Sequence, residues 1–178
     1  MTLLHRFAIP MDATGRLAAW LTPLGMIAII GSALGFEHLG GYAPCALCLE
    51  QRVPYYWGIP FVVAGALALL VKAPPAFVRA MMAIGFFCLL ATAAIGAYHA
   101  GVEWGFWPGP TSCTASITGT ASDAGSLLQD LAVAKPPSCD AAAGRFLGIS
   151  FAGWNVIAAF ALACVTARAA FGQGKRSS

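Results

Sequence analysis

The chain has 178 residues, of which 59% are hydrophobic and only 10% are charged, and its mean hydropathy is +0.76. Soluble globular domains carry about 25% charged residues, so this composition excludes a water-soluble domain and indicates a protein solvated largely by lipid. The net charge of +3 is small and scattered, and no run of adjacent basic residues is longer than Lys175-Arg176, which argues against a nucleic-acid partner.

Charged residues divide most of the chain into four long uncharged stretches. These stretches hold 20, 19, 23 and 22 residues, and they lie between Arg16 and Glu37, Arg52 and Lys72, Arg79 and Glu103, and Arg145 and Arg168. About 20 apolar residues, at ~1.5 Å each, cross a ~30 Å hydrocarbon layer. The pattern predicts an all-α membrane protein, a single domain over 1–178 that forms a four-transmembrane-helix bundle, with spans at about 17–36, 53–71, 80–102 and 146–167.

Two further stretches need an interpretation. The uncharged segment 104–122 is rich in Pro, Gly, Ser and Thr, which favour turns, so it is not predicted to span. The first span exceeds the usual 7–15-residue apolar region of a signal peptide and lacks a clear cleavage site, so we expect an uncleaved anchor.

Pro54 and Pro60 predict a kink in the second span.

Basic residues predict the orientation. Four spans place both termini on one side, and that side, with the loop at 72–79, holds seven Lys and Arg residues against three on the other side. Because basic residues favour the cytoplasm, we expect both termini to be cytoplasmic. The segments at about 37–51 and 103–144 then face outward.

The six cysteines form two groups. Cys88 and Cys164 lie inside the third and fourth spans, where a free cysteine packs as a small apolar residue. The other four lie in the outer segments, where disulfides persist: Cys45 and Cys48 form a CxxC motif before the second span, and Cys113 and Cys139 lie 26 positions apart.

Three uses of the outer cysteines are open. Four thiolates can bind zinc, but a structural zinc site usually has a second closely spaced pair, which Cys113 and Cys139 do not form, so no metal is expected. Two static disulfides are a second possibility, although a short CxxC loop gains little from closure. Strained pairs are the labile, catalytic ones, which favours a redox function.

Arg52 follows Cys48 by four positions, which places both on one face if the helix has begun there. A helix N-terminus and a guanidinium both stabilise a thiolate, so the spacing predicts a reactive Cys48 beside Arg52. Arg52 as a simple interfacial anchor is the alternative.

Two redox pairs on the outer side indicate an electron relay, which moves two electrons at a time. The sequence has no CxxCH haem motif and no glycine-rich dinucleotide loop, so a membrane quinone is the expected acceptor by elimination. His99, at the outer end of the third span, and the aromatic residues Tyr55, Tyr56 and Trp57 are candidates to line its pocket.

The same residues resemble the DsbB family of bacterial inner-membrane disulfide-forming proteins, over nearly the whole chain. The resemblance rests on four features: Cys45-Ala46-Leu47-Cys48 followed by Glu50-Gln51-Arg52, the string from Tyr98 to Trp104, the separated Cys113 and Cys139, and Phe146-Leu147-Gly148 with Trp154-Asn155.

The resemblance implies a mechanism and a setting. A periplasmic, thioredoxin-fold oxidase of the DsbA type attacks a Cys113–Cys139 bridge through Cys113, and the Cys45–Cys48 disulfide then re-forms that bridge. Cys48 passes the electrons to ubiquinone or menaquinone, with Arg52 holding the charge of the Cys48–quinone adduct. The resemblance also implies a bacterial inner-membrane location and a short surface helix in the long periplasmic loop, for which Ser126–Leu131 is the candidate.

Two other functions are compatible with the sequence. A quinone reductase of the vitamin K epoxide reductase type also joins a four-helix bundle to a CxxC and a loop pair, but its CxxC lies near the end of a late span. The other is a non-enzymatic membrane protein with two structural disulfides, whose bridges would stay oxidised when quinone is depleted.

Overall fold

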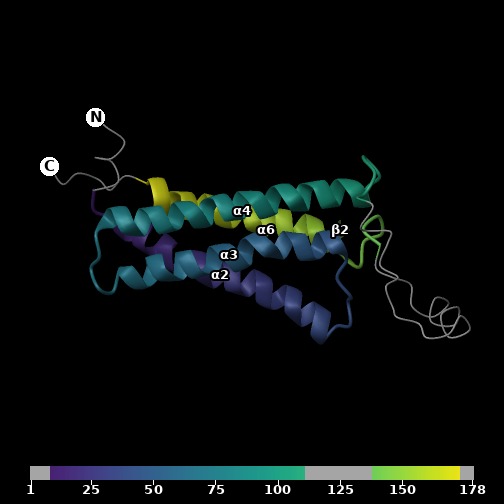
Figure 1. Ribbon diagram of the computed structural model, residues 1–178, viewed down its shortest axis with the longest axis horizontal. Helices are drawn as coiled ribbons and strands as arrows, with labels where there is room; N and C mark the ends of the chain where they lie inside the picture. The colour runs from purple at the N-terminus through teal and green to yellow at the C-terminus, as the bar shows by residue number, and fades with distance from the viewer. Residues whose placement is uncertain (1–8, 111–137, 173–178) are drawn as a thin grey trace, which may run out of the picture.

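The computed structural model describes residues 9–110 and 138–172, and within them four long helices lie side by side (Figure 1). In chain order the helices are α2 (Ala13–His38), α3 (Ala46–Ala68), α4 (Pro75–Glu103) and α6 (Phe151–Phe171). We call the end where α2 begins and α6 ends the termini end, and the end where α3 begins and α4 ends the cysteine end. The predicted surface helix at 126–131 lies outside the described residues.

Three of the helices, α2, α4 and α6, are long and apolar enough to cross a membrane. This confirms a helical membrane protein. The α3 helix is 23 residues long but is not among the three, because its first turns carry Glu50, Gln51 and Arg52 and its middle carries Tyr56 and Trp57. The fourth transmembrane span therefore stays a prediction.

The helices begin at side chains that cap their free N–H groups. Asp12 accepts a hydrogen bond of 2.9 Å from the Gly15 N–H, and the Ser150 hydroxyl accepts one of 3.2 Å from Gly153. The first turn of a helix has no intrahelical partners for its N–H groups, so such acceptors favour a start at that position. In α3 the capping residue is Cys45, which sets the position of the CxxC motif at the exact start of the helix.

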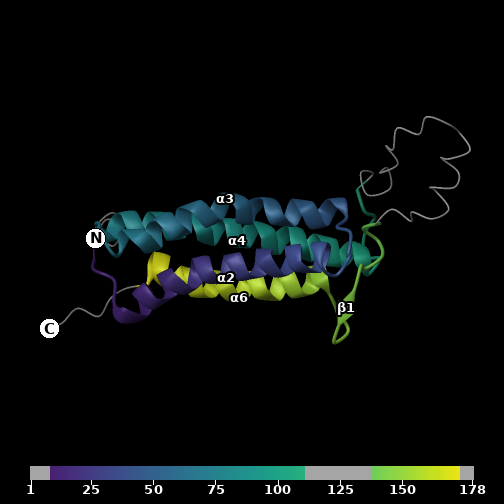
Figure 2. The same ribbon diagram turned by 90° about the horizontal axis from the view of Figure 1, so that it is seen from below.

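A short hairpin precedes α6, which begins later than predicted. Strands β1 (Arg145–Phe146) and β2 (Ile149–Ser150) pair antiparallel, and Leu147 and Gly148 join them with φ angles of 52° and 79°. Two positive φ angles are typical of a type I′ turn, in which glycine is favoured. The prediction of helix over 146–150 was thus wrong, and Figure 2 shows the hairpin projecting from the side of the bundle.

The helices pack closely where small residues face large ones. A Cβ atom on Gly85 of α4 would lie 2.1 Å from Cγ1 of Val62 of α3, so the two backbones approach only because this residue is glycine. On the other side, the hydroxyls of Thr22 and Thr166 form a buried hydrogen bond of 3.0 Å between α2 and α6. The α4 helix packs along both α3 and α6.

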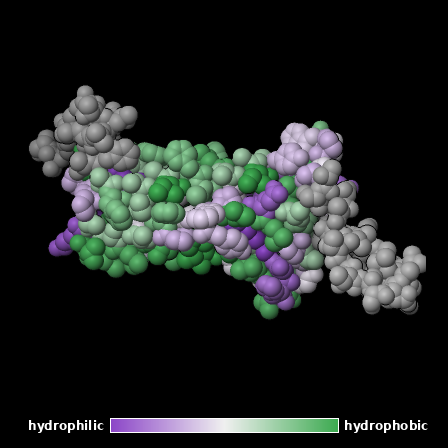
Figure 3. Space-filling view, viewed as in Figure 1, coloured by the Kyte–Doolittle hydropathy of each residue, from purple (hydrophilic) through white to green (hydrophobic). Residues whose placement is uncertain are grey.

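Large apolar side chains cover the outside of the bundle. Leu24, Phe87 and Phe160 are about 60% exposed, at 61%, 63% and 59%. Figure 3 shows hydrophobic residues over much of the visible face and the more hydrophilic ones gathered mainly near the ends. Exposed apolar surface of this extent marks a membrane interaction surface.

The termini end is held by two arginines. Arg168 forms an ion pair with Asp12, which joins the end of α6 to the start of α2. The buried Arg79 donates a hydrogen bond of 2.6 Å to the Gly172 carbonyl and one of 3.3 Å to the Ala170 carbonyl. These contacts join the end of α6 to α2 and α4.

Candidate functional site

The CxxC motif opens α3 with its two sulfurs in contact. Cys45 is the N-cap residue, and its Sγ accepts a hydrogen bond of 3.4 Å from the Cys48 N–H. Both cysteines are free thiols, and their Sγ atoms lie 3.2 Å apart. One turn of helix therefore places Cys48 directly beside Cys45, in the geometry that thiol–disulfide exchange within the pair requires.

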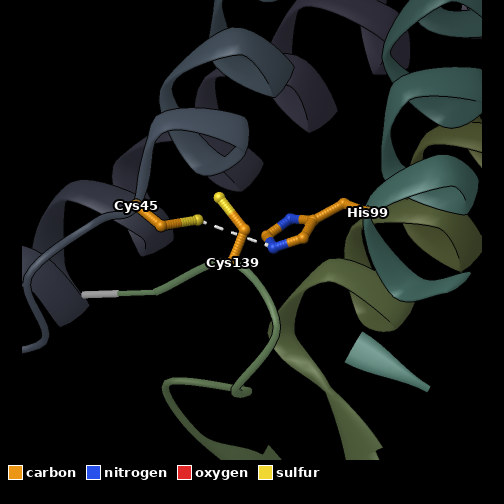
Figure 4. Close-up of side chains that lie close together, drawn as sticks. All are labelled: Cys45, His99 and Cys139. Carbon is orange, nitrogen blue, oxygen red and sulfur yellow. Dashed lines mark hydrogen bonds between the residues drawn. The ribbon is translucent and has the colours of Figure 1, made fainter. Parts of the chain in front are cut away.

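His99 reaches this pair from the end of α4. Its ring is 2% exposed, and its Nε2 atom lies 3.5 Å from the Cys45 Sγ (Figure 4). The sequence placed His99 at the outer end of the third span as a residue of a quinone pocket. The structure instead brings it against Cys45, and it is not solvated.

Cys139 completes the cluster from the segment that follows the long loop. It is 1% exposed and disulfide-bonded, and it packs with Cys45, Leu47 and Val102. The sulfurs of Cys45 and Cys139 and a ring nitrogen of His99 all lie within 4.8 Å of one another. Figure 4 shows the three side chains converging from three separate segments. Cys113, the expected partner of Cys139, lies outside the described residues.

The contact between the two sulfurs shifts the pKa values of the pair in opposite directions. The pKa of Cys45 is lowered to about 4 by its side-chain hydrogen bond with Cys48, and burial opposes this while the contact with His99 adds to it. The same hydrogen bond, together with burial, raises the pKa of Cys48, which precedes the predicted second span. These directions favour Cys45 as the thiolate of the reduced pair, whereas the sequence predicted a thiolate at Cys48.

Arg52 does not pair with Cys48 as expected. Its Nη1 donates to the Oε2 of Glu37, at the end of α2, and forms an ion pair that is only partly exposed. Arg52 and Cys48 nevertheless line one cavity, described below. The guanidinium carries five N–H donors, so the contact with Glu37 leaves others for a ligand in that cavity.

A buried hydrogen-bond chain leads from His99 into the bundle. The Nδ1 atom of His99 lies 2.6 Å from Nε2 of Gln51, and Oε1 of Gln51 accepts a bond of 2.8 Å from Asn155. The Tyr55 hydroxyl donates to Oδ1 of Asn155 at 2.9 Å. The Thr92 hydroxyl donates to the main-chain carbonyl of Gln51 at 2.6 Å. The chain fixes the imidazole ring, because both side-chain ends of Gln51 are engaged.

Glu103 lies beside Nε2 of His99, the ring nitrogen that does not face Gln51. Its Oε1 lies 3.7 Å from Nε2 of His99, and its side chain is 4% exposed. Its Oε2 has no hydrogen-bond partner among the described residues. Burying a carboxylate oxygen without a hydrogen-bond partner raises the free energy of the folded state. Glu103 is therefore a candidate functional residue.

Two cavities meet at Cys48. A cavity of about 310 Å³ lies between α2, α3 and α6, and its lining includes Cys48, Arg52, Tyr55 and Asn155. A second cavity, of about 220 Å³, is lined by Cys45, Cys48, His99 and Glu103 among others. The larger cavity lies at the lower end of the range for ligand sites, ~300–1,000 Å³, and Cys48 belongs to the wall of both.

The aromatic residues of α3 differ in burial according to the face of the helix on which each lies. Tyr55 is buried and lines the larger cavity. Tyr56 and Trp57 are 51% and 69% exposed and are not among the residues that line this cavity. Successive residues on a helix point in different directions, and only Tyr55 shares a face with Cys48 and Gln51.

Sequence reasoning missed the roles of Glu37, Gln51, Glu103 and Asn155. Only Asn155 lies within a predicted span, where a polar residue is expensive and marks a functional position. That signal was available for Asn155, whereas Gln51 lies in the predicted outer segment 37–51. No sequence signal pairs Glu37 with Arg52 or Glu103 with His99.

Comparison with known proteins agrees with this geometry. The family model described as "Disulfide bond formation protein DsbB" matches residues 15–169. This range includes every cysteine, all of α3 and α4, α2 from Gly15 and α6 up to Ala169. No curated protein and no solved structure matches the chain. The family match confirms an oxidoreductase role in disulfide bond formation, and the chain belongs to the DsbB family.

Proposed function

We propose that the protein reoxidises a periplasmic DsbA-type, thioredoxin-fold oxidase and passes the electrons to a membrane quinone, ubiquinone or menaquinone. It does so in the bacterial inner membrane, with both termini cytoplasmic. The observation that carries this proposal is the position of Cys48 between the two cavities, with Cys45 and Cys139 on one side and Arg52 on the other. Family membership favours this relay over static disulfides.

The first exchange takes place between the two pairs. A thiolate of the partner attacks Cys113, forms a mixed disulfide and releases Cys139 as a thiolate. Cys139 then attacks Cys45 of an oxidised Cys45–Cys48 pair, which forms a Cys45–Cys139 disulfide and breaks the Cys45–Cys48 bond. The closeness of the two sulfurs supports this choice of target, because their donor atoms lie within 4.8 Å. The second partner thiolate then attacks the mixed disulfide, releasing the oxidised partner and Cys113.

The same step changes the chemistry of Cys48. In the reduced Cys45–Cys48 pair the contact between the sulfurs and burial raise the pKa of Cys48. In the relay Cys45 passes from its bond with Cys48 to a bond with Cys139, and Cys48 leaves as a thiolate. The thiolate is the reactive form of cysteine, so the exchange delivers Cys48 to the larger cavity in its reactive form.

The residues around the larger cavity fit a quinone head group. A quinone supplies a two-electron, two-proton acceptor with carbonyl oxygens that accept hydrogen bonds. Arg52 and Asn155 offer N–H donors, while Ile29, Ile30 and Ala33 offer apolar surface. Cys48 lies against this space. The Nε2 atom of His99 lies beside Cys45, 3.5 Å from its Sγ. Arg52 thus binds and orients, and Cys48 supplies the electrons. Cys113 then displaces Cys45 from Cys139, which re-forms the loop bridge, and the freed Cys45 bonds with Cys48 as the electrons leave.

The experiment is a turnover assay in lipid nanodiscs. The purified protein, a reduced DsbA-type oxidase in excess and either ubiquinone or menaquinone are mixed, and the partner's thiols and the reduced quinone are counted. We expect one quinol for each partner disulfide over many turnovers. The Cys48→Ala variant should lose turnover, and Cys164→Ala is the matched control.

The same assay also gives results that would contradict the proposal. A partner that stays reduced in the presence of quinone and oxidised protein contradicts the proposal, as does full turnover by Cys48→Ala. Bridges that stay oxidised when quinone is removed and reduced partner is added indicate static disulfides instead.

A further inference from the structure

Three metal-binding donor atoms meet at the cysteine end of the bundle. They are the Sγ atoms of Cys45 and Cys139 and a ring nitrogen of His99, all within 4.8 Å of one another. All three residues are buried, at 6%, 1% and 2% exposed. Two further donors stand next to them, with the Cys48 Sγ 3.2 Å from the Cys45 Sγ and the Glu103 Oε1 3.7 Å from His99 Nε2.

One of the distances among these atoms is that between two ligand atoms of a tetrahedral zinc site. Zn–S bonds of ~2.3 Å and Zn–N bonds of ~2.0–2.1 Å in a tetrahedron set neighbouring ligand atoms roughly 3.5–3.8 Å apart. The Cys45 Sγ and His99 Nε2 atoms lie 3.5 Å apart. Thiolate and imidazole are the ligands that zinc and cadmium prefer, in contrast to magnesium or calcium.

Glu103 gives a second, independent indication of a cation. Its Oε2 is buried and has no hydrogen-bond partner among the described residues. The residue lines the same cavity of about 220 Å³ as Cys45, Cys48 and His99. A cation among these side chains would supply the partner that this carboxylate lacks.

We propose that the reduced protein binds a thiophilic divalent cation, Zn²⁺ or Cd²⁺, through Cys45, Cys139 and His99. Cys139 is disulfide-bonded in the structure, so the site is complete only after that disulfide has taken up two electrons and two protons. The inference rests on the proposed function, because the relay opens this disulfide during turnover. In the test a phosphine reductant opens it, and metal binding then releases the thiol protons.

The buried hydrogen-bond chain suits a histidine ligand. A metal on Nε2 leaves the imidazole proton on Nδ1, which then needs an acceptor. Gln51 meets Nδ1 at 2.6 Å, and rotating its amide presents oxygen there. Asn155 and Tyr55 can reverse in the same way, since an amide and a hydroxyl both donate and accept. The chain thus serves the metal-bound ring as well as the metal-free ring.

A bound metal would stop the relay at its central step. It holds Cys45 and Cys139 as ligands, so neither sulfur is available to form the Cys45–Cys139 disulfide. The site would therefore make the enzyme sensitive to zinc in its reduced state and insensitive in its oxidised state.

The test uses the full-length protein in detergent, with no partner and no quinone. Cd²⁺ alone is titrated into protein reduced with tris(2-carboxyethyl)phosphine, and the thiolate-to-metal charge-transfer absorption in the ultraviolet is recorded. We expect one tightly bound Cd²⁺ per chain in the reduced protein and none at this site in the oxidised protein. Zn²⁺ should displace Cd²⁺ and remove the absorption.

Variants locate the ligands. His99→Ala and Cys139→Ser should each weaken Cd²⁺ binding by at least ~10–100-fold, the loss seen when even an outer-shell partner is removed. Cys164→Ala, with its exposed thiol on α6, is the matched control and should bind as the parent does. Circular dichroism and thermal melting of each variant check that it folds.

Three results would overturn the proposal: no Cd²⁺ bound by the reduced protein, equal binding by the oxidised protein, or unchanged affinity in both His99→Ala and Cys139→Ser. The last would mean that Cys45 and Cys48 alone chelate the metal. Because the titration contains neither quinone nor partner, it can succeed when the turnover assay fails, and the reverse.

Discussion

The Nε2 atom of His99 lies 3.5 Å from the Sγ of Cys45, although 54 positions separate the two residues in the chain. Cys45 caps the N-terminus of α3, and His99 lies near the C-terminus of α4, so the antiparallel packing of these helices brings the two together. The contact places a buried imidazole nitrogen beside the Cys45 sulfur. Because His99 contacts Cys45 at this distance, the two thiols of the CxxC motif have different surroundings.

We expect the thiolate of Cys45 to persist in acid. Its pKa is lowered to about 4, so the ionised form is present above that pH and is lost as the pH falls through it. Alkylation of the reduced protein by iodoacetamide, mapped by mass spectrometry with the other cysteines except Cys48 replaced by alanine, should modify Cys45 first down to about pH 4. In His99→Ala the midpoint should rise by about 1–2 units, for a hydrogen bond of ~1.5–3 kcal/mol to a charged group. An unchanged midpoint would mean that the ring does not stabilise the thiolate.

Replacing Cys113 or Cys139 with serine should block oxidation of the soluble partner. The Cys45–Cys48 pair should still become oxidised by added quinone, because Cys48 lines the larger cavity without help from Cys139. Thiol trapping of each cysteine in membranes, with and without quinone, measures both effects. Normal partner oxidation by either variant would contradict a relay through two cysteine pairs.

Arg52→Gln should slow quinone reduction roughly ten- to a hundredfold. A charge-assisted hydrogen bond from a guanidinium contributes ~1–3 kcal/mol, and ~1.4 kcal/mol corresponds to a factor of ten. Arg52→Lys should keep part of the activity, because it keeps the charge but loses the planar fork. Stopped-flow measurement of quinone reduction gives the rates.

The ion pair with Glu37 provides a control for Arg52. Glu37→Gln removes the partner of Arg52 but leaves the guanidinium in the cavity wall. We therefore expect Glu37→Gln to reduce the rate less than Arg52→Gln, and the double variant to resemble Arg52→Gln alone. Full turnover in Arg52→Gln would leave Arg52 as an interfacial anchor.

Cys88 and Cys164 should be dispensable. Cys164 is exposed on α6, and Cys88 is half-buried in α4, where it packs against Gly58 of α3. Changing both to alanine should leave turnover within about twofold and lower the stability by at most ~1–2 kcal/mol, since one small apolar group is lost from a partly buried position. Abolished activity in a well-folded double variant would assign these thiols a role that their positions do not indicate.

Asn155→Leu should destabilise the protein more than Tyr55→Phe. Asn155 bonds to both Gln51 and Tyr55, so its loss leaves two buried polar groups without partners, whereas Tyr55→Phe leaves one. Each unsatisfied group costs ~1–3 kcal/mol. Thermal melting in one detergent, with Cys164→Ala as the reference, compares them, and equal melting temperatures for the two variants would argue against a continuous chain.

Local patterns along the chain are enough to predict the membrane class and the thiol chemistry of the CxxC motif. Long uncharged stretches locate α2, α4 and α6, because crossing a bilayer needs about 20 apolar residues in a row whatever surrounds them. The CxxC motif likewise carries its geometry locally, since one helical turn sets the distance between Cys45 and Cys48. Even here the start of α6 was predicted too early, because the hairpin turn at Leu147 and Gly148 depends on backbone angles that hydropathy does not report.

The residues that surround the thiols could not be predicted in this way, because helix packing brings them together. Helical spacing placed Arg52 beside Cys48, yet its guanidinium bonds to Glu37 of another helix, since an opposite charge attracts it more strongly than a neutral thiol does. The contacts of Cys45 with His99 and Cys139 likewise join separate segments of the chain. Such contacts depend on how helices pack and turn toward each other, and the order of residues along one helix does not specify them.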